Sequence, residues 1–487
     1  MNNKKVRTRF APSPTGYMHI GNLRTALYAY LFAKSQQGDF ILRIEDTDRA
    51  RYVADAVEFI ENTLKAARIY PDEGPHNGGD YGPYVQSERM DIYKKYAEEL
   101  VANGHAYRCF CESKAENESQ DSDKKFSGYN RHCRELTQEE INKNLAEGKP
   151  YVIRQKMPLT GETTFFDVLH GNITIANEEL EDQVLLKSDG MPTYNFANVI
   201  DDHLMKVTHI IRGTEFITST PKHVLLYKFF GWEMPEFIHL APVMGKAEDG
   251  SVSKLSKRHG ATSFGDLVEM GYLPEAITNY VALLGWNPKN TNQEIFTMEE
   301  LIKVFSLDGL SKSPAVFDYD KLNWMSSEYF KNMSDADFAE AMSKFVTLDD
   351  NLQSKREYLA SLLKTRISRL NEIPDMIKFL MEMPEFDADL FVNKRNKVTV
   401  EKSIELLTPA VSMLESIEDW SVDTINERIA KFTAETGLKT GTVMWPLRIA
   451  VSGQKVTPGG VTEILYLLGK KISLERMKQS LDKLQNL

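Results

Sequence analysis

Two separate segments of the chain contain residue types suited to binding a nucleoside triphosphate. The first runs from residue 9 to 22 and joins a predicted strand to the N-terminus of a predicted helix. Backbone N–H groups and the helix dipole at such a junction favour anions, and Gly21 lets a base or phosphate approach the backbone closely. His19 could donate a hydrogen bond to phosphate oxygens as they gain charge. A Pro-rich turn that only caps a helix is the alternative.

The second segment is a loop over residues 253–260 that places Lys254, Lys257 and Arg258 within five residues. Cations on a loop rich in Ser and Gly suit a triphosphate. Such a loop can close over the nucleotide and stabilise charge during transfer. The alternative is a solvated basic loop on the surface, because charge runs commonly have that role.

All cysteines of the chain, Cys109, Cys111 and Cys133, lie in one short window. A Cys-x-Cys pair followed by a second pair of ligands fits a tetrahedral structural zinc site. The fourth ligand stays open at this point, and His132 is the chemically ordinary candidate because imidazole is a common zinc ligand. Three reduced thiols in a polar insertion are the alternative interpretation.

Alternating strands and helices are predicted to position the first segment. Apolar patterns indicate strands at 6–11 and 40–44 and helices at 21–36 and 54–69. A strand, a helix and a second strand of these lengths form a βαβ unit with parallel pairing. Ligands bind beyond the carboxyl ends of strands in open α/β sheets, so we expect residues 9–13 and 44–48 to line a site.

The rest of the chain divides into an insertion, a resumed α/β pattern and a helical half. Strands are predicted at 151–157, 163–168 and 171–175 in the insertion and at 184–187 and 208–212 after it, with a helix at 218–230. Helical patterns dominate beyond residue 263. We therefore expect an α/β front half with an insertion and an all-helical back half.

Composition excludes several classes of protein. The chain has 487 residues, 42% hydrophobic and 26% charged, which is typical of globular proteins rather than disordered or collagen-like ones. Its longest apolar run is far shorter than the about 20 residues of a membrane span, and we recognise no signal peptide or lipidation motif. A net charge of −11 excludes a basic coat but allows a local basic face. Few cysteines favour a reducing, cytosolic compartment.

Together, in this order, the two segments resemble the signature motifs of class I aminoacyl-tRNA synthetases. The first contains His19-Ile20-Gly21-Asn22, and the second contains Lys254-Leu255-Ser256-Lys257. Longer strings resemble the glutamyl/glutaminyl branch: RTRFAPSPTG at 7–16, LRIEDTD at 42–48, YVQSER at 84–89, LLKSDGMPTY at 185–194 and NVIDDH at 198–203. The string FDYDKLNWM at 317–325 is similar to bacterial glutamyl-tRNA synthetases. The helical C-terminal half also resembles that type, since glutaminyl enzymes carry β-barrels there.

The resemblance implies a fold, a reaction and partners. The fold would be α/β with a Rossmann-type parallel sheet, an inserted connective domain and an all-α anticodon-binding half. The reaction would be ATP-dependent ligation of L-glutamate to tRNA(Glu) through glutamyl-adenylate, with Mg²⁺ accompanying ATP. We expect a cytoplasmic monomer with no membrane partner. A non-discriminating enzyme that also glutamylates tRNA(Gln) is the alternative.

The same resemblance implies domain boundaries. The two halves of the Rossmann fold would be 1–107 and 190–262, with the connective insertion for the tRNA acceptor end at 108–189. A stem-contact helical region would follow at 263–330, and the anticodon-binding helices would occupy 331–487.

Carrying the motifs over residue by residue implies individual roles. The catalytic residues, which would stabilise the α-phosphate and the leaving pyrophosphate, are His19, Lys254 and Lys257. The implied ATP-binding residues are Thr15, His19, Gly21, Asn22, Glu215, Lys254, Ser256, Lys257 and Arg258. The implied glutamate-binding residues are Arg9, Ala11, Ser13, Glu45, Tyr194, Asn198 and Arg212.

The resemblance also bears on the metal and on the anticodon. Some glutamyl-tRNA synthetases carry Cys-x-Cys…Tyr-x-x-x-Cys, which favours Tyr129 over His132 as the fourth zinc ligand, although many members lack the site. Arg366 stands where an arginine accompanies discrimination between glutamate and glutamine anticodons, with a solvated helix face as the alternative.

Two other activities remain as rivals. A small-molecule nucleotidyltransferase could share the first motif, but such enzymes seldom carry a long helical half. An inactive synthetase-like RNA-binding protein is disfavoured because His19, Glu45, Arg212 and Lys257 are intact.

Overall fold

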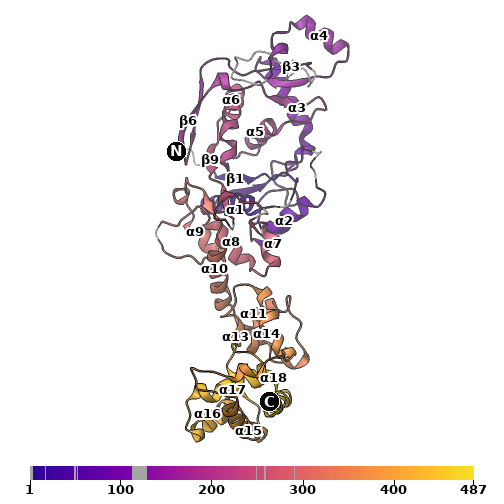
Figure 1. The fold of residues 1–487 in the computed structure, drawn as a ribbon. Coiled ribbons are helices and arrows are strands. Elements are labelled where there is room, and N and C mark those ends of the chain that lie inside the picture. The colour runs from indigo at the N-terminus through magenta and orange to yellow at the C-terminus, as the bar shows by residue number, and fades with distance from the viewer. Residues whose placement is uncertain are drawn as a thin grey trace. The chain divides into compact units, whose positions relative to one another are not determined.

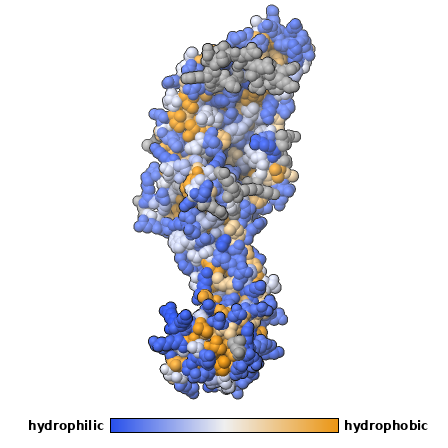
Figure 2. Space-filling view, in the orientation of Figure 1, coloured by the Kyte–Doolittle hydropathy of each residue, from blue (hydrophilic) through white to orange (hydrophobic). Residues whose placement is uncertain are grey.

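The computed structural model describes residues 4–486 except 17, 49–50, 52, 112–128, 248, 257–258, 261 and 290. The chain forms two compact units, one of residues 1–267 and 274–319 and the other of residues 268–273 and 320–487 (Figure 1). Hydrophilic residues cover most of the face shown in Figure 2. Within the described part of the chain, no helix is long and apolar enough to cross a bilayer.

The first unit begins with the strand–helix–strand that the sequence predicts. β1 (Arg7–Phe10), α1 (Ile20–Ser35) and β2 (Asp39–Leu42) follow one another along the chain. β1 and β2 pair in parallel, with Arg7 opposite Asp39. Every residue of β1 is buried, as expected for a parallel strand that is covered on both faces. The parallel βαβ unit is therefore confirmed.

A four-stranded sheet in the order β6-β5-β9-β8 forms the second part of the α/β core (Figure 1). Its strands are β5 (Glu162–Asp167), β6 (Gly171–Ala176), β8 (His209–Gly213) and β9 (Glu236–Leu240). β8 and β9 are parallel and are connected through α6 (Thr220–Phe230). The backbone N–H of Thr208 donates to the carbonyl of Arg7, so β8 begins beside β1.

The partners of two strand segments differ from the grouping expected from sequence. The hairpin of β5 and β6 was expected within the insertion, but β5 pairs with β9 and extends the sheet of β8. Residues 184–187 were expected in the resumed α/β pattern. Instead, β7 (Val184–Leu186) pairs with β4 (Val152–Gln155), which pairs with β3 (Ala106–Cys109). An alternation of apolar and polar residues predicts a strand, but the pattern does not specify which distant strand will pair with that strand.

The remaining elements of the first unit include helices and one small sheet. The helices are α2 (Ala56–Ala66), α3 (Met90–Ala102), α4 (Gln138–Ala146), α5 (Tyr194–Leu204), α8 (Pro274–Ala282) and α9 (Met298–Val304). The sheet contains β11 (Val252–Lys254), β10 (Val243–Lys246) and β12 (Ala315–Val316). α7 (Phe264–Glu269) and α10 (Tyr319–Asn332) each contain residues of both units. Tyr93, Phe196 and Leu226 pack α3, α5 and α6 into one apolar core.

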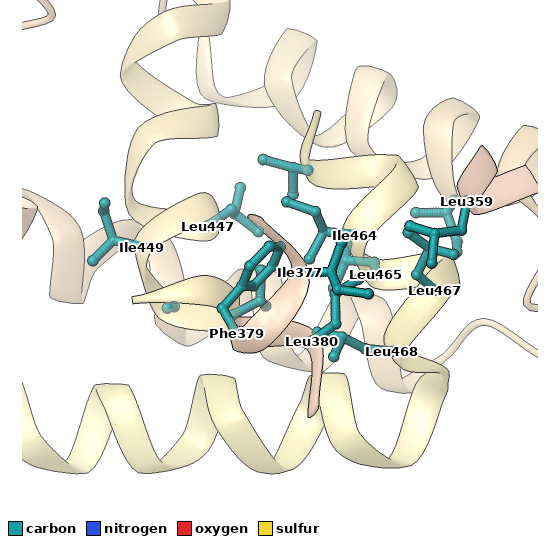
Figure 3. Packing of buried hydrophobic residues seen from close by; sticks show 14 of the residues in the cluster. Leu359, Ile377, Phe379, Leu380, Leu447, Ile449, Ile464, Leu465, Leu467 and Leu468 are labelled. Carbon is teal, nitrogen blue, oxygen red and sulfur yellow. The ribbon is translucent and has the colours of Figure 1, made fainter. Parts of the chain in front are cut away.

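The described residues of the second unit form helices and no strand, as the helical patterns predict. These helices are α11 (Asp335–Met342), α12 (Asp350–Gln353), α13 (Arg356–Leu363), α14 (Ile373–Met381), α15 (Val400–Glu415), α16 (Val422–Thr436), α17 (Thr440–Ser452), α18 (Val461–Leu468) and α19 (Lys470–Gln485). Their apolar faces meet in one core, in which Leu359, Ile377, Leu447 and Leu465 come from four different helices (Figure 3).

A buried arginine of α19 connects three helices of this unit. Arg476 Nη1 donates to the carbonyls of Phe379 at 2.7 Å and Val451 at 3.0 Å, and Nη2 donates to that of Leu380 at 3.2 Å. These carbonyls lie in the last turns of α14 and α17, where the helix itself supplies no N–H partner. Arg476 therefore satisfies two helix ends inside the core.

We expect Arg476→Met to destabilise this unit by about 3 kcal/mol, because three buried carbonyls would lose their donor at about 1 kcal/mol each. Hydrogen–deuterium exchange on the full chain should show faster exchange at the ends of α14 and α17. Arg428→Met, at an exposed position on α16, is the matched control. Unchanged exchange at both helix ends in the Arg476 variant would contradict the prediction.

Candidate active site

A cavity of about 630 Å³ opens in the first unit where β1, α1, α5 and β8 meet. It brings together most of the residues singled out from the motifs, namely Arg9, Ala11, Ser13, Thr15, His19, Gly21, Asn22, Glu45, Tyr194, Arg212, Glu215 and Lys254. Asn198 and Ser256 are not among the lining residues. Lys257 and Arg258 lie outside the described residues. The two separate segments of the sequence thus meet around one cavity through His19 and Lys254.

His19 caps the N-terminus of α1 with its own side chain. Its Nδ1 accepts a hydrogen bond from the backbone N–H of Gly21 at 3.0 Å, so the ring proton resides on Nε2 when the imidazole is neutral. Removal from bulk water and the positive charge of Lys254 lower the pKa of His19. A Cβ on Gly21 would lie 2.9 Å from His19 Cε1, so a side chain there would displace the ring. His19 is therefore arranged as a neutral hydrogen-bond donor beside a helix N-terminus.

Lys254 is the last residue of β11 and so ends a strand, where the sequence predicts a loop over 253–260. Ser253 and Ser256 on either side of it contact the ring of His259, which the motifs did not single out. The backbone N–H of Ser256 donates to His259 Nδ1 at 3.1 Å, and His259 Nε2 lies 3.2 Å from Ser253 Oγ. A Cβ on Gly245 would lie 2.6 Å from His259 Cγ, so the ring packs directly on the backbone of β10. The position of His259 within the basic string at 253–260 is the only signal in the sequence that could have indicated these contacts.

Buried ion pairs form the wall of the cavity where β1, the residues after β2 and α5 meet. Arg9 Nε lies 3.2 Å from Asp202 Oδ1, and Arg43 Nη1 donates to the same oxygen at 2.8 Å. Arg43 Nη2 also donates to Glu45 Oε1 at 3.1 Å. Burial raises the pKa of Glu45 to about 7, although Arg43 and Arg9 act in the opposite direction. Burial would likewise raise the pKa of Asp202, but Arg9 and Arg43 hold it below its ordinary value.

Arg212 differs from Arg9 in its partners. Both side chains are buried and line the cavity, but Arg212 donates to His239 at 3.1 Å and to Thr220 Oγ1 at 2.8 Å. Among the described residues, no carboxylate oxygen lies within 4.0 Å of its guanidinium. Burial lowers the pKa of Arg212, while Tyr194 favours its charged form. Asp202 also favours the charged form from beyond that distance, so the cavity contains a cation that no carboxylate of the described residues contacts directly.

Two further predicted residues lie at the start of α5. Tyr194 packs against Phe216, with ring centroids 5.3 Å apart, and burial raises its pKa. Asn198 is buried one helical turn further along. Its Nδ2 is buried and has no hydrogen-bond partner among the described residues.

The predicted metal ligands are close together in space. The sulfur atoms of Cys109, Cys111 and Cys133 lie within 4.8 Å of one another, and those of Cys111 and Cys133 are 3.4 Å apart. Tyr129 Oη lies 3.1 Å from Cys109 Sγ and 3.8 Å from Cys111 Sγ. His132 is exposed and does not belong to this cluster. The three sulfurs are placed as a structural zinc site requires. The phenol oxygen of Tyr129 is the fourth group beside them, although burial raises its pKa and so disfavours the phenolate.

Arg366 lies in the second unit, at a separate cavity of about 580 Å³. The other lining residues are Glu372, Asp375, Met376, Gln454, Val456, Thr457 and Pro458. Val456 is 76% exposed. A cation, the carboxylate of Asp375 and an exposed apolar side chain thus line one cavity, while the carboxylate of Glu372 is paired with Arg369 at 2.9 Å.

Comparisons with known proteins match both units of the chain. The family model of the catalytic domain of class I tRNA synthetases (E and Q) matches residues 5–324, and an anticodon binding domain model matches residues 329–481.

The similar curated proteins match over their full length. A glutamate–tRNA ligase of Clostridium botulinum (strain Eklund 17B / Type B) is 50% identical over 494 residues and covers 100% of both chains. One of Clostridium tetani is 50% identical over 493 residues, covering 100% of this chain and 99% of that one. The crystal structure of a glutamate tRNA ligase from Elizabethkingia meningosepticum, in complex with its amino acid, is similar at TM-score 0.87 and 37% identity. It covers 99% of this chain and 100% of that chain.

The environment of His19 leads to a test by NMR. We expect its imidazole to titrate below 6.5 in the full chain, since desolvation and Lys254 both disfavour the protonated ring. Lys254→Ala should raise this pKa, and Lys246→Ala, an exposed change on β10, should leave it unaltered. A ring that titrates at or above 6.5, or that ignores the Lys254 change, would show that this electrostatic description is wrong.

Proposed function

The chain belongs to the class I tRNA synthetase family for glutamate and glutamine, and we propose that the cavity of its first unit ligates L-glutamate to tRNA(Glu) with ATP. The observation that supports this most directly is the meeting of Arg212, Glu45, His19 and Lys254 around one cavity. An amino acid with two carboxylates and one ammonium requires fixed cations and one fixed anion. An ATP triphosphate requires donors and cations beside it.

Glutamate would bind at the end of the cavity that contains the buried arginines. Arg212 and Arg9 would hold the two carboxylates, and Glu45 would accept the α-ammonium group. Arg212 would attract a substrate carboxylate more strongly than Arg9, because Asp202 already pairs with Arg9 and compensates part of its charge. The remaining contacts would be neutral hydrogen bonds and close backbone approach from Ala11, Ser13, Tyr194 and Asn198.

ATP would lie across the N-terminus of α1. The Nε2–H of His19 and the side chain of Lys254 would stabilise charge at the α-phosphate and on the leaving pyrophosphate, where positioned donors have their largest effect. Thr15, Gly21 and Asn22 would complete the cradle, and Ser256, Lys257 and Arg258 would approach from the loop. Glu215 would face the ribose or adenine. Its carboxylate packs on Gly213, where a Cβ would lie 2.0 Å from Glu215 Oε2. Mg²⁺ would accompany the ATP phosphates.

The reaction then proceeds in two transfers. An oxygen of the glutamate α-carboxylate attacks the α-phosphorus of ATP, and the bond to pyrophosphate breaks to give glutamyl-adenylate. The terminal ribose hydroxyl of the tRNA next attacks the glutamyl carbonyl and releases AMP. Both steps depend on positioning and charge stabilisation more than on covalent catalysis by the protein.

The other parts of the chain would contact tRNA. Residues 108–189 would meet the acceptor end, residues 263–330 the stem, and the helices over 331–487 the anticodon. The cavity beside Arg366 supports an anticodon contact there, because the guanidinium of Arg366 offers a plane on which an unpaired base can stack. We further propose that the chain acts in the cytoplasm as a monomer, with its cysteines reduced.

The test of this function is charging of total bacterial tRNA with labelled glutamate and, separately, with labelled glutamine. We expect glutamate on tRNA(Glu), and His19→Ala should lower kcat by about 100-fold or more while leaving the Kd for tRNA unchanged. Glutamate on tRNA(Gln) as well would favour the non-discriminating alternative and remove the role of Arg366. Charging with glutamine, or with neither amino acid, would overturn the assignment.

The cysteine cluster would hold a structural zinc ion through Cys109, Cys111, Cys133 and Tyr129. The ion would cross-link residues 109–111 to residues 129–133. We expect about one zinc per chain in the purified protein. Cys111→Ser should abolish binding, and Tyr129→Phe should weaken it, while His132→Ala serves as the control. Zinc loss in the His132 variant alone would reassign the fourth ligand, and zinc-free wild type would favour three reduced thiols.

A further inference from the structure

Neutral groups hold the guanidinium of Arg212 on two sides. Its Nε donates to His239 Nε2 at 3.1 Å, and its Nη1 and Nη2 each lie 3.3 Å from His223 Nδ1. Thr220 Oγ1 accepts a third bond at 2.8 Å. All four side chains are more than nine-tenths buried. The orientation of the guanidinium is thus constrained by side chains that bring no negative charge to it.

These contacts determine the tautomer of each histidine. A guanidinium only donates hydrogen bonds, so His239 must present a lone pair at Nε2 and His223 must present one at Nδ1. The proton of His239 then lies on Nδ1 and is donated to Asp167 Oδ2 at 2.7 Å. That of His223 lies on Nε2 and is donated to Asn195 Oδ1 at 2.9 Å. Each histidine therefore has an acceptor where its tautomer requires one.

The surroundings keep both rings neutral. Burial and the charge of Arg212 lower the pKa of His223. Burial also lowers the pKa of His239, although the bond to Asp167 acts in the opposite direction. A protonated ring would lose its lone pair and repel Arg212, so neutrality is what the hydrogen-bond geometry demands.

Asp167 holds the far end of a hydrogen-bonded relay that runs from Arg212 through His239 to this carboxylate. It is fully buried at the end of β5 in the hairpin with β6. Its Oδ1 accepts the backbone N–H groups of Leu169 and His170 at 2.9 Å each, and its Oδ2 also accepts that of His239 at 3.0 Å. The carboxylate is held by four donors, so it stays away from Arg212 and leaves the cation to the cavity.

We propose that Asp167, His239 and His223 are positioning residues that present Arg212 as an oriented cation whose charge they do not neutralise, and thereby make the site select a carboxylate over the matching carboxamide. The inference rests on the proposed function, in which Arg212 holds a glutamate carboxylate. A carboxylate bound directly to Arg212 would orient the guanidinium equally well but would neutralise it. Neutral acceptors orient it without that loss. A carboxamide NH₂ placed against the guanidinium would then face its N–H donors, which leaves buried polar groups unpaired.

The test compares His239→Leu, which removes the acceptor, with His239→Gln, which can restore one. We expect His239→Leu to raise KM for glutamate by roughly 10- to 100-fold, the range for losing one hydrogen bond to a charged group. KM for ATP and for tRNA should change little, and the preference for glutamate over glutamine in kcat/KM should fall. His239→Gln should recover part of both. His76→Gln is the control, since His76 is an exposed histidine of the same unit that lies outside this network.

A general packing defect predicts a different pattern, in which kcat and every KM change together and His239→Gln gives no recovery. That pattern, or an unchanged KM for glutamate in a folded His239→Leu protein, would overturn the proposal. Wild-type protein that charges no tRNA with glutamate would instead sink the proposed function itself, so the two failures are distinguishable.

A second measurement uses the unmodified full chain and does not depend on the variants folding. Nitrogen-15 NMR of labelled imidazoles at neutral pH should find His239 protonated at Nδ1 only and His223 at Nε2 only. A charged ring or the opposite tautomer at either position would overturn the relay.

Discussion

Arg9 and Arg43 share the carboxylate of Asp202 at the place where β1, the segment after β2 and α5 converge. Arg43 also binds Glu45, and Arg89 binds the neighbouring Asp201 at 2.7 Å. These charges are almost completely buried, so each depends on its partners. Removing one partner of a buried pair typically costs about 3–5 kcal/mol, because the remaining charge is left uncompensated. The cluster therefore holds the elements of the cavity in one arrangement.

The same constraint explains why the two arginines of the cavity have different surroundings. A buried cation can be stabilised by an anion, as Arg9 is, or by several neutral acceptors, as Arg212 is. The first solution gives rigidity and reduces the attraction for an anionic ligand. The second solution retains that attraction, because hydrogen bonds satisfy the donors without cancelling the charge. A cavity that binds an anionic amino acid benefits from having both.

Much of this organisation could be predicted from the sequence. The family resemblance and the α/β architecture with an all-α C-terminal half are confirmed by the family models and by the similar crystal structure. His19, Glu45, Arg212 and Lys254 were singled out because motif strings place them at strand ends or in the basic loop, and these ends converge on one cavity. The roles of these residues in binding and catalysis stay predictions. Asn198 and Ser256 were singled out by the same strings, yet neither lines the cavity.

The sequence by itself determined the parallel βαβ unit, the helical C-terminal half and the chemistry available at the motifs, because periodicity and residue type are local properties. It did not indicate the strands β9, β10 and β11. Only the tertiary structure decided that β5 joins the sheet of β9 and that β7 joins β4, since strand pairing depends on distant segments. It also decided the partners of Arg212. His239 and Asp167 carry no local signal, for a histidine or an aspartate on a strand is ordinary until the fold places it. Burial then converts their hydrogen bonds into a constraint on one guanidinium, because donors and acceptors inside the protein have no water to replace them.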